Sequence, residues 1–184
     1  MTNKNYLTGA AGMQFHSFFA FDLSGVTGPF SAAQLSLFNP LNGYDGLNAN
    51  ATETLTIYDF SSSIPTLLNG TGGLGAYNDL GSGTVLGTTT VSAANNNSFV
   101  TVNLNAAGVA AFNAAGTGQI VLGGSLGSSP GGFVFGFSGA ESTGVDLTPG
   151  GPVAAAPAPP TLLAGLFGIG VAGLGGVVRR LRRR

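Results

Sequence analysis

The side chains that could carry out acid–base or nucleophilic chemistry are few in this chain of 184 residues. It has one histidine, His16, seven acidic residues and no cysteine, which excludes thiolate nucleophiles, disulfides and cysteine-ligated metals. A Ser-His-Asp triad needs a carboxylate beside its histidine, but Asp22 lies six residues from His16, roughly 20 Å along an extended strand. We also expect no nucleophile elbow of the Gly-x-Ser-x-Gly type. We therefore predict that His16 is an ordinary histidine at a surface or sheet edge, and that the protein is not an enzyme.

The acidic residues offer two further kinds of site. Four of them could converge in space as a hydrolytic pair about 5–9.5 Å apart, an alternative that stays open: Asp45, Glu53, Asp59 and Asp79. Asn42 and Asp45 lie in an oxygen-rich loop that could bind Ca²⁺, although the spacing of a calcium loop is missing and turn chemistry alone accounts for Asn, Asp and Gly there. We predict no cofactor and no metal, with these two residues as the candidate calcium ligands.

Three tyrosines, Tyr44, Tyr58 and Tyr77, could offer a surface for stacking on sugar rings if the fold brings them together. The chain has no tryptophan, which argues against a strong sugar platform. These residues support an alternative function, a carbohydrate-binding module for a matrix polysaccharide.

The elements that would position these residues are mostly short strands. Apolar and polar residues alternate around Phe15, Phe19 and Phe21, a pattern typical of a half-buried strand, although Phe18 falls on the polar side. One helix is predicted over residues 105–115, with Asn105 as its N-cap and Gly116 as its stop, whereas 64–68 reads as a short helical or irregular connection and 70–83 as a loop. We predict strands over residues 13–23, 33–37, 54–60, 85–91, 99–104, 120–122, 133–137 and 145–147. This pattern favours an all-β fold, an antiparallel β-sandwich or jelly roll with one short helix.

Composition divides the chain into parts. Residues 1–148 form the predicted domain, and residues 149–160 are a linker rich in Pro, Gly and Ala that favours an extended conformation. Before the C-terminal tail, one lysine stands against seven acidic residues, a net charge of −6, which excludes an electrostatic surface for nucleic acid. Only 7% of the residues are charged, and the polarity of the body comes from Gly, Ser, Thr and Asn. Such a composition suits an extracellular β-protein.

The tail combines an apolar segment with a basic end. Residues 161–178 are uncharged, and 162–178 would span roughly 26 Å as a helix, a short transmembrane span. Small residues recur every four positions and would let another helix approach closely: Ala164, Gly168, Ala172 and Gly176. Residues 179–184 carry five arginines, which stay on the cytoplasmic side and place the body outside the inner membrane: Arg179, Arg180, Arg182, Arg183 and Arg184. A nucleic-acid-binding tail and a buried helix of the domain are the alternatives; we predict a membrane anchor.

The order of these parts resembles a known bacterial signal. Pro157, Ala158, Pro159 and Pro160, then the apolar segment and the arginines, resemble the PEP-CTERM sorting domain of Gram-negative bacteria. The resemblance implies recognition by an exosortase, a membrane cysteine protease that cleaves near the proline motif during export. Ala158 stands where the family has glutamate, and this departure leaves open whether the protease cleaves the chain efficiently.

The body is similar to exported jelly-roll domains of PEP-CTERM proteins of unknown function, through residues 18–26 and 33–40. Together these features predict an exported, non-enzymatic protein of the cell surface or extracellular matrix, first anchored in the inner membrane. Its predicted partners are the membrane, an exosortase-type protease and an exopolysaccharide. The N-terminus has no apolar signal-peptide core, and we expect such a peptide upstream of Met1.

Overall fold

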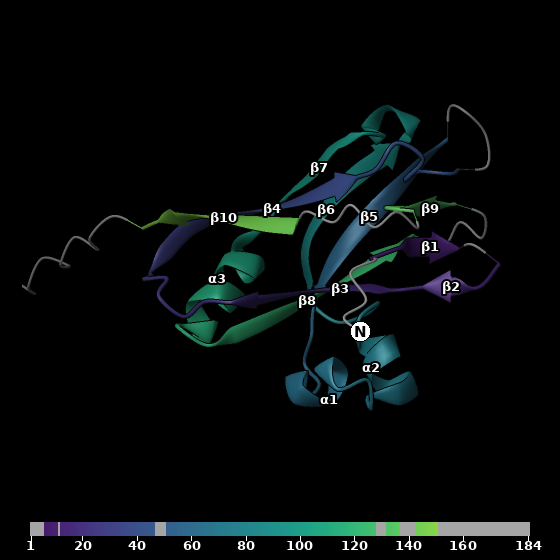
Figure 1. The fold of residues 1–184 in the computed structure, drawn as a ribbon. Helices are drawn as coiled ribbons and strands as arrows, with labels where there is room; N and C mark the ends of the chain where they lie inside the picture. Colours follow the sequence, from purple (N-terminus) through teal and green to yellow (C-terminus); the bar gives the residue numbers. More distant parts are fainter. Residues whose placement is uncertain (1–5, 11, 47–50, 128–131, 137–142, 151–184) are drawn as a thin grey trace, which may run out of the picture. The chain divides into compact units, whose positions relative to one another are not determined.

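The computed structural model describes residues 6–10, 12–46, 51–127, 132–136 and 143–150 (Figure 1). The chain divides into two compact units, Met1–Gly151 and Pro152–Arg184, and all described residues belong to the first. In chain order the elements are β1 (Thr8–Ala10), β2 (Gln14–Phe15), β3 (Ser17–Asp22), β4 (Phe30–Asn39), β5 (Thr52–Asp59), α1 (Ile64–Leu68), α2 (Gly73–Asp79), β6 (Val85–Ser92), the 3-10 turn η1 (Ala93–Asn95), β7 (Ser98–Asn103), α3 (Ala106–Ala115), β8 (Gln119–Leu126), β9 (Phe133–Val134) and β10 (Thr143–Pro149).

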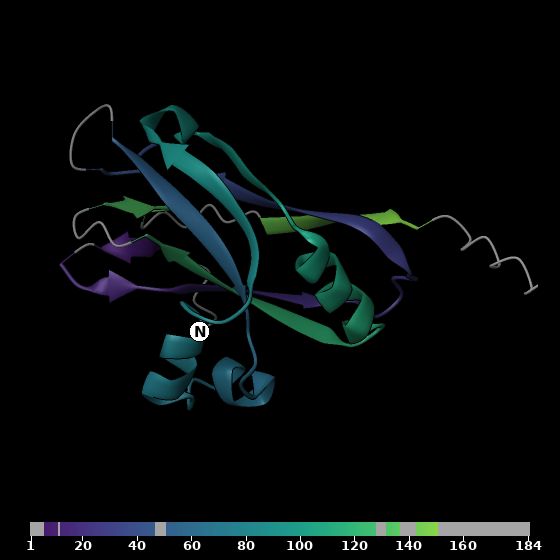
Figure 2. The same cartoon turned by 180° about the vertical axis from the view of Figure 1, so that it is seen from behind.

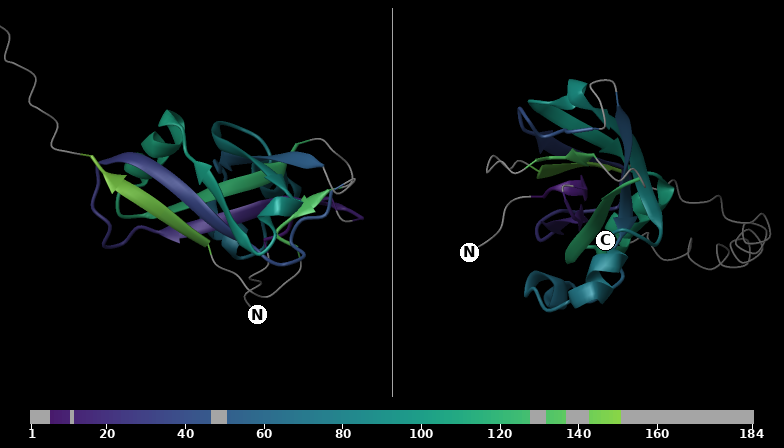
Figure 3. Two further views of the ribbon diagram at one scale, coloured as in Figure 1. Left: turned by 90° about the horizontal axis from the view of Figure 1, so that it is seen from above. Right: turned by 90° about the vertical axis from the view of Figure 1, so that its right-hand side faces the viewer.

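The strands form three antiparallel sheets. The largest has four strands in the order β3-β8-β5-β6, and the second has three in the order β10-β4-β7. Seen from above, β10 runs beside β4 (Figure 3). The short strands β2, β1 and β9 make the third sheet. The predicted antiparallel, mostly β fold is confirmed.

Alternation along the strands builds one core that the sheets share. Leu35 and Leu37 of β4 are fully buried, whereas Gln34 and Ser36 beside them are partly exposed. The same core contains Leu55 of β5 and residues of β3, β7 and β8. Burying each leucine contributes about 1.5–3 kcal/mol, so the inner faces of these strands carry much of the stability. The outer faces carry mainly polar residues, with Phe18 and Phe99 among the exposed exceptions.

The predicted helix is confirmed as α3. The side chain of Asn105 accepts a hydrogen bond from the backbone N–H of Gly108 at 3.0 Å, as an N-cap does, and Gly116 ends the helix with φ 58°. Phe112 is fully buried, which fixes α3 against the core. Figure 2 shows the helix between β7, which precedes it, and β8, which follows it.

Two predictions about local structure were wrong. Residues 70–83 are not simply a loop, because they contain α2, so α3 is not the only helix of the described part. The short helical connection expected at residues 64–68 forms as α1. Glycines in α2 disfavour a helix by about 0.5–1 kcal/mol each, but the Leu80 carbonyl lies against Gly123 of β8, where any side chain would collide with it. The packing of the C-terminal end of α2 against β8 therefore outweighs the low helix preference of its glycines. The predicted strand over residues 13–23 also begins too early, because Met13 precedes β2 and is 68% exposed instead of contributing to the core.

No helix among the described residues is long and apolar enough to cross a membrane. The predicted span, residues 161–178, lies outside the described residues, as do the linker beyond Gly150 and the arginine cluster.

Candidate functional site

His16 joins α2 to the sheet. Its ring stacks on the ring of Tyr77, with centroids 4.3 Å apart and planes inclined by 7°. His16 Nδ1 lies 2.8 Å from the backbone oxygen of Tyr77, and because a carbonyl only accepts, Nδ1 is the donor. A carboxylate is therefore not in the position that orients a triad histidine. His16, predicted at a surface or sheet edge, is half-buried and lies between β2 and β3 in the chain. Its contacts with Tyr77 connect these strands to α2.

One segment does match the Gly-x-Ser-x-Gly pattern, contrary to the prediction, at residues 123–127. Its serine, Ser125, lies within β8 and is only 9% exposed. Ser125 Oγ donates to the backbone oxygen of Leu126 at 3.0 Å. A nucleophile elbow requires a sharp strand-to-helix turn with an exposed serine, so this match is a strand and not a catalytic motif.

Three of the described carboxylates, those of Asp22, Asp59 and Asp79, hold turns. Asp79 accepts hydrogen bonds from the backbone N–H groups of Ser61 and Ser62 at 2.9 and 2.7 Å and from Ser61 Oγ at 2.9 Å. Burial raises the pKa of Asp79, but the hydrogen bonds from Ser62 and Ser61 outweigh it and hold this pKa below its ordinary value. Asp59 accepts from the backbone N–H of Thr84 at 2.7 Å, and Asp22 from that of Ser24 at 2.9 Å, which lowers the pKa of Asp22. These carboxylates have structural partners.

The candidate calcium ligands stay separate from any cluster. Asn42 and Asp45 are exposed, and the backbone of Asp45 pairs with Phe133 through hydrogen bonds of 3.0 and 2.8 Å. Among the described residues, no group of three or more His, Cys, Asp or Glu side chains could hold a metal ion. The described part of this loop contains a turn in which the backbone N–H of Gly43 donates to the Pro40 carbonyl at 2.9 Å.

The three tyrosines do not form one exposed surface, which was the condition for stacking on a sugar ring. Tyr44 is 6% exposed and belongs to the core. Its hydroxyl donates to the backbone oxygen of Ala51 at 2.9 Å; burial, with the charges of Glu53 and Asp45, raises its pKa. Tyr58 is half-buried on β5, and Tyr77 is occupied by His16 and by the Gln14 carbonyl.

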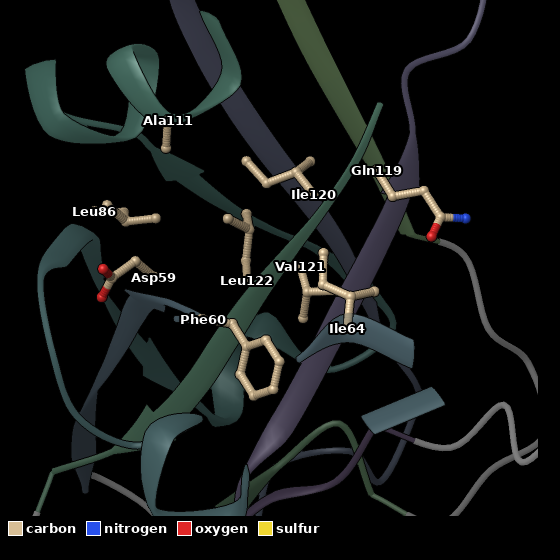
Figure 4. Close-up of a pocket in the computed structure, with 9 residues that line it drawn as sticks. All are labelled: Asp59, Phe60, Ile64, Leu86, Ala111, Gln119, Ile120, Val121 and Leu122. Atoms are coloured by element: carbon tan, nitrogen blue, oxygen red, sulfur yellow. The ribbon is translucent and has the colours of Figure 1, made fainter. Parts of the chain in front are cut away.

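A small pocket lies where β5 ends beside β8 (Figure 4). Its volume is about 210 Å³, and its walls are mainly apolar, among them Leu86, Ile120 and Leu122. Asp59 is its one carboxylate, and that group is engaged by Thr84. The pocket thus offers an apolar surface with no second titratable group for acid–base chemistry.

A larger candidate is the outer face of the sheet β10-β4-β7, which we call the amide–aromatic face. Three rows cross it in register: Phe38 and Phe99; Ser36, Thr101 and Gly144; and Gln34, Asn103 and Asp146. The rings of Phe38 and Phe99 meet edge to face with centroids 5.4 Å apart, and Phe99 is 53% exposed. Gln34 Nε2 donates to Asn103 Oδ1 at 2.7 Å. These three strands contain no lysine or arginine.

Sequence reasoning missed this face, although a signal was present. Phe38 has the same strand parity as Gln34 and Ser36, and Phe99 has the parity of Thr101, so both phenylalanines are out of phase with the apolar pattern. A large apolar side chain on a polar face is the informative exception.

The mostly β antiparallel fold defines only a broad class. Comparisons with protein-family models, with curated proteins and with solved structures found no match. Function is therefore argued from the chain's own residues.

Proposed function

We propose that the protein is an exported, non-enzymatic component of the bacterial cell surface or extracellular matrix, sorted by its C-terminal segment. The observation that carries this proposal is the order of three unlike parts at the chain end: the proline motif 157–160, the uncharged segment 161–178 and five arginines in 179–184. The arginines hold the tail in the inner membrane, and an exosortase-type protease releases the body near Pro159. The described part of the body is consistent with the proposal, because three of its carboxylates, those of Asp22, Asp59 and Asp79, hold turns.

We also propose that the described strands of the body follow the strand order of a jelly roll. A jelly roll has eight strands, B to I, in two sheets of order C-H-E-F and B-I-D-G. Taking β3 as C, the order β3-β8-β5-β6 matches the first sheet, and β10-β4-β7 matches I-D-G of the second. Strand B, the partner of I, has no counterpart beside β10 among the described residues.

Fractionation of the native bacterium tests the sorting proposal. With the exosortase present, the body is expected at the surface or in the medium, and its mass should lack the residues after the proline motif. In an exosortase deletion strain, the full chain should stay in the membrane. Ala158→Glu, which restores the family's glutamate, should raise the released fraction, whereas Ala154→Glu in the same linker should leave it unchanged. A body found in the cytoplasm with its tail intact in both strains refutes the proposal.

The amide–aromatic face favours a second candidate function, binding of a neutral polysaccharide. Phe99 gives a sugar ring an exposed aromatic edge and face, and the hydrogen bond between Gln34 and Asn103 fixes two amides beside it. Gln34 Oε1 and Asn103 Nδ2 remain for sugar hydroxyls, and Asp146 can accept from a third. The acidic body disfavours polyuronates by charge repulsion, so an uncharged chain fits best.

Affinity electrophoresis tests this second function with the full chain in gels that contain hydroxyethyl cellulose or alginate. Retardation by hydroxyethyl cellulose should weaken about tenfold in Phe99→Ala, since one aromatic contact contributes about 1.5 kcal/mol. Phe18→Ala is the matched control, because Phe18 is 42% exposed on β3 of the other sheet. Equal retardation by alginate, or equal loss in both variants, contradicts binding at this face.

A further inference from the structure

The two larger sheets are joined on one side and separate on the other. β6 leads through η1 into β7, and a bridge between Gly87 and Leu104 also links the sheets there. On the opposite side lie the edge strands β3 and β10. Among the described residues, β3 pairs only with β8 and β10 only with β4. Each strand therefore presents one edge of backbone N–H and C=O groups without a strand partner in the described part of the chain.

An apolar groove lies between these two edges. Its volume is about 450 Å³, and it is lined from the β3 side by Phe21 and Val26 and from the β10 side by Val145 and Leu147. All four side chains are half-buried and pack against the core. The core thus reaches the surface along this seam, where a covering element would remove apolar area from water.

We infer that the edge of β10 binds an added β-strand, an extended peptide with apolar side chains at alternate positions and basic residues at its ends. The strand order indicates the place, because strand B of a jelly roll pairs with strand I, here β10, and no described strand takes that position. β10 is seven residues long, and alternate residues of an edge strand point their backbone N–H and C=O groups away from the paired strand, here β4. These outward groups are sufficient to form a hydrogen-bond ladder with one added strand. This inference uses the body alone and does not depend on the sorting tail.

The side-chain pattern of the occupant follows from the groove. Every second residue of an added strand faces the apolar seam, so these positions need Val, Ile or Leu. Two exposed acidic residues lie on the strands that border the groove: Asp22, which lines it at the end of β3, and Asp146, which lies on the outer face of the edge strand β10. The strands β3 and β10 contain no lysine or arginine, so lysine at the ends of the peptide gives charge complementarity.

The test uses the full chain and a labelled synthetic peptide, Lys-Thr-Val-Thr-Val-Thr-Val-Thr-Lys, followed by fluorescence anisotropy. Saturable binding is expected, with slower hydrogen exchange of the β10 amides. Two peptide controls should bind at least about tenfold more weakly. One has a central proline, which cannot donate to the ladder, and the other has glutamate in place of both lysines.

Variants of the protein locate the site. Val145→Lys places an ammonium group in the seam and should weaken binding about tenfold or more. Val85→Lys is the matched control, because Val85 is 41% exposed on β6, at the joined side. Asp146→Lys changes an exposed residue, so it keeps the proposal testable if Val145→Lys fails to fold. This variant should bind the glutamate peptide more tightly than the lysine peptide, the reverse of the wild type.

Three results would overturn the inference. One is no binding of the lysine peptide. Another is equal binding by Val145→Lys and Val85→Lys. The third is occupation of the edge by a second copy of the chain. In that case sedimentation would show dimers of the wild type that are lost in Val145→Lys, and the wild type would not bind the peptide.

Discussion

Asn39 is the buried polar residue whose removal should cost the fold most. Its side chain is fully buried at the end of β4. Asn39 Oδ1 accepts from the backbone N–H of Phe135 at 2.9 Å, and Nδ2 donates to Asn95 O at 3.2 Å and to Asn96 Oδ1 at 3.0 Å. Asn96 Oδ1 also accepts from the backbone N–H of Tyr44 at 2.8 Å. One amide therefore ties the ends of three chain segments together.

The loss expected for Asn39→Ala follows from these contacts. Three hydrogen bonds disappear, each with a net value of about 0.5–1.5 kcal/mol, and the buried N–H of Phe135 is left without its acceptor, at about 1–3 kcal/mol. Allowing for water at the half-buried Asn95 and Asn96, the free energy of unfolding should fall by about 3–5 kcal/mol. A domain of this kind has about 5–15 kcal/mol in total. Asn39→Asp should lose at least as much, because its second carboxylate oxygen would face two acceptors.

Urea unfolding followed by tyrosine fluorescence measures this loss, since the chain has four tyrosines and no tryptophan. Asn113→Ala is the matched control, because Asn113 also bridges backbone groups, those of Phe30, at 2.7 and 3.0 Å, but is exposed. We expect the control to lose about 1 kcal/mol. The reasoning fails if Asn39→Ala loses no more than Asn113→Ala, or if Asn39→Asp is as stable as the wild type.

Two further predictions concern α2 and Gly81, which follows it. The folded-state pKa of Asp79 is lowered, so its stabilisation is full above its unfolded value of about 3.9 and is lost as the pH falls through the folded value. The difference in unfolding free energy between wild type and Asp79→Asn should therefore shrink below about pH 4, and a difference that grows there would contradict the assignment. A side chain at Gly81 would collide with the His16 ring, so Gly81→Ala should lose about 1–3 kcal/mol in thermal unfolding. Gly75→Ala, within α2 and with open space around it, should gain about 0.5–1 kcal/mol, and the two changes must differ in sign.

The strands and α3 were predictable because their signals are local. The alternation of Leu35 and Leu37 with Gln34 and Ser36 is visible in the sequence, and the inner face it predicts is the buried one. The N-cap of α3 is likewise a short-range interaction, three residues long. Signals of this kind need no knowledge of which strands become neighbours.

The features that sequence reasoning missed depend on long-range contacts. Tyr44 is buried because the core closes over it, and its glycine-rich surroundings resemble an exposed turn. The helix α2 depends on Gly123, which lies far along the chain and leaves room for the Leu80 carbonyl. The amide–aromatic face required the register of β4 with β7, which brings Gln34 to Asn103. Which strands become edges follows only from the complete strand order.

The charge-poor composition bears directly on the open edge of β10. Exposed edge strands are ordinarily protected by lysines, prolines, bulges or inward-pointing charges. In β10, the proline and the bulge lie together at one end, where Pro149 stands and the pairing register shifts between Thr148 and Pro149. From Thr143 to Leu147, only Asp146 is charged, and it has the parity of the outer face, whereas Val145 and Leu147 line the seam. With a single lysine ahead of the arginine tail, the body has almost none of the residue that most often protects an edge. A covering strand would keep this seam from pairing with other chains, and the proposed surface or matrix location, crowded with neighbours, would make that protection more necessary.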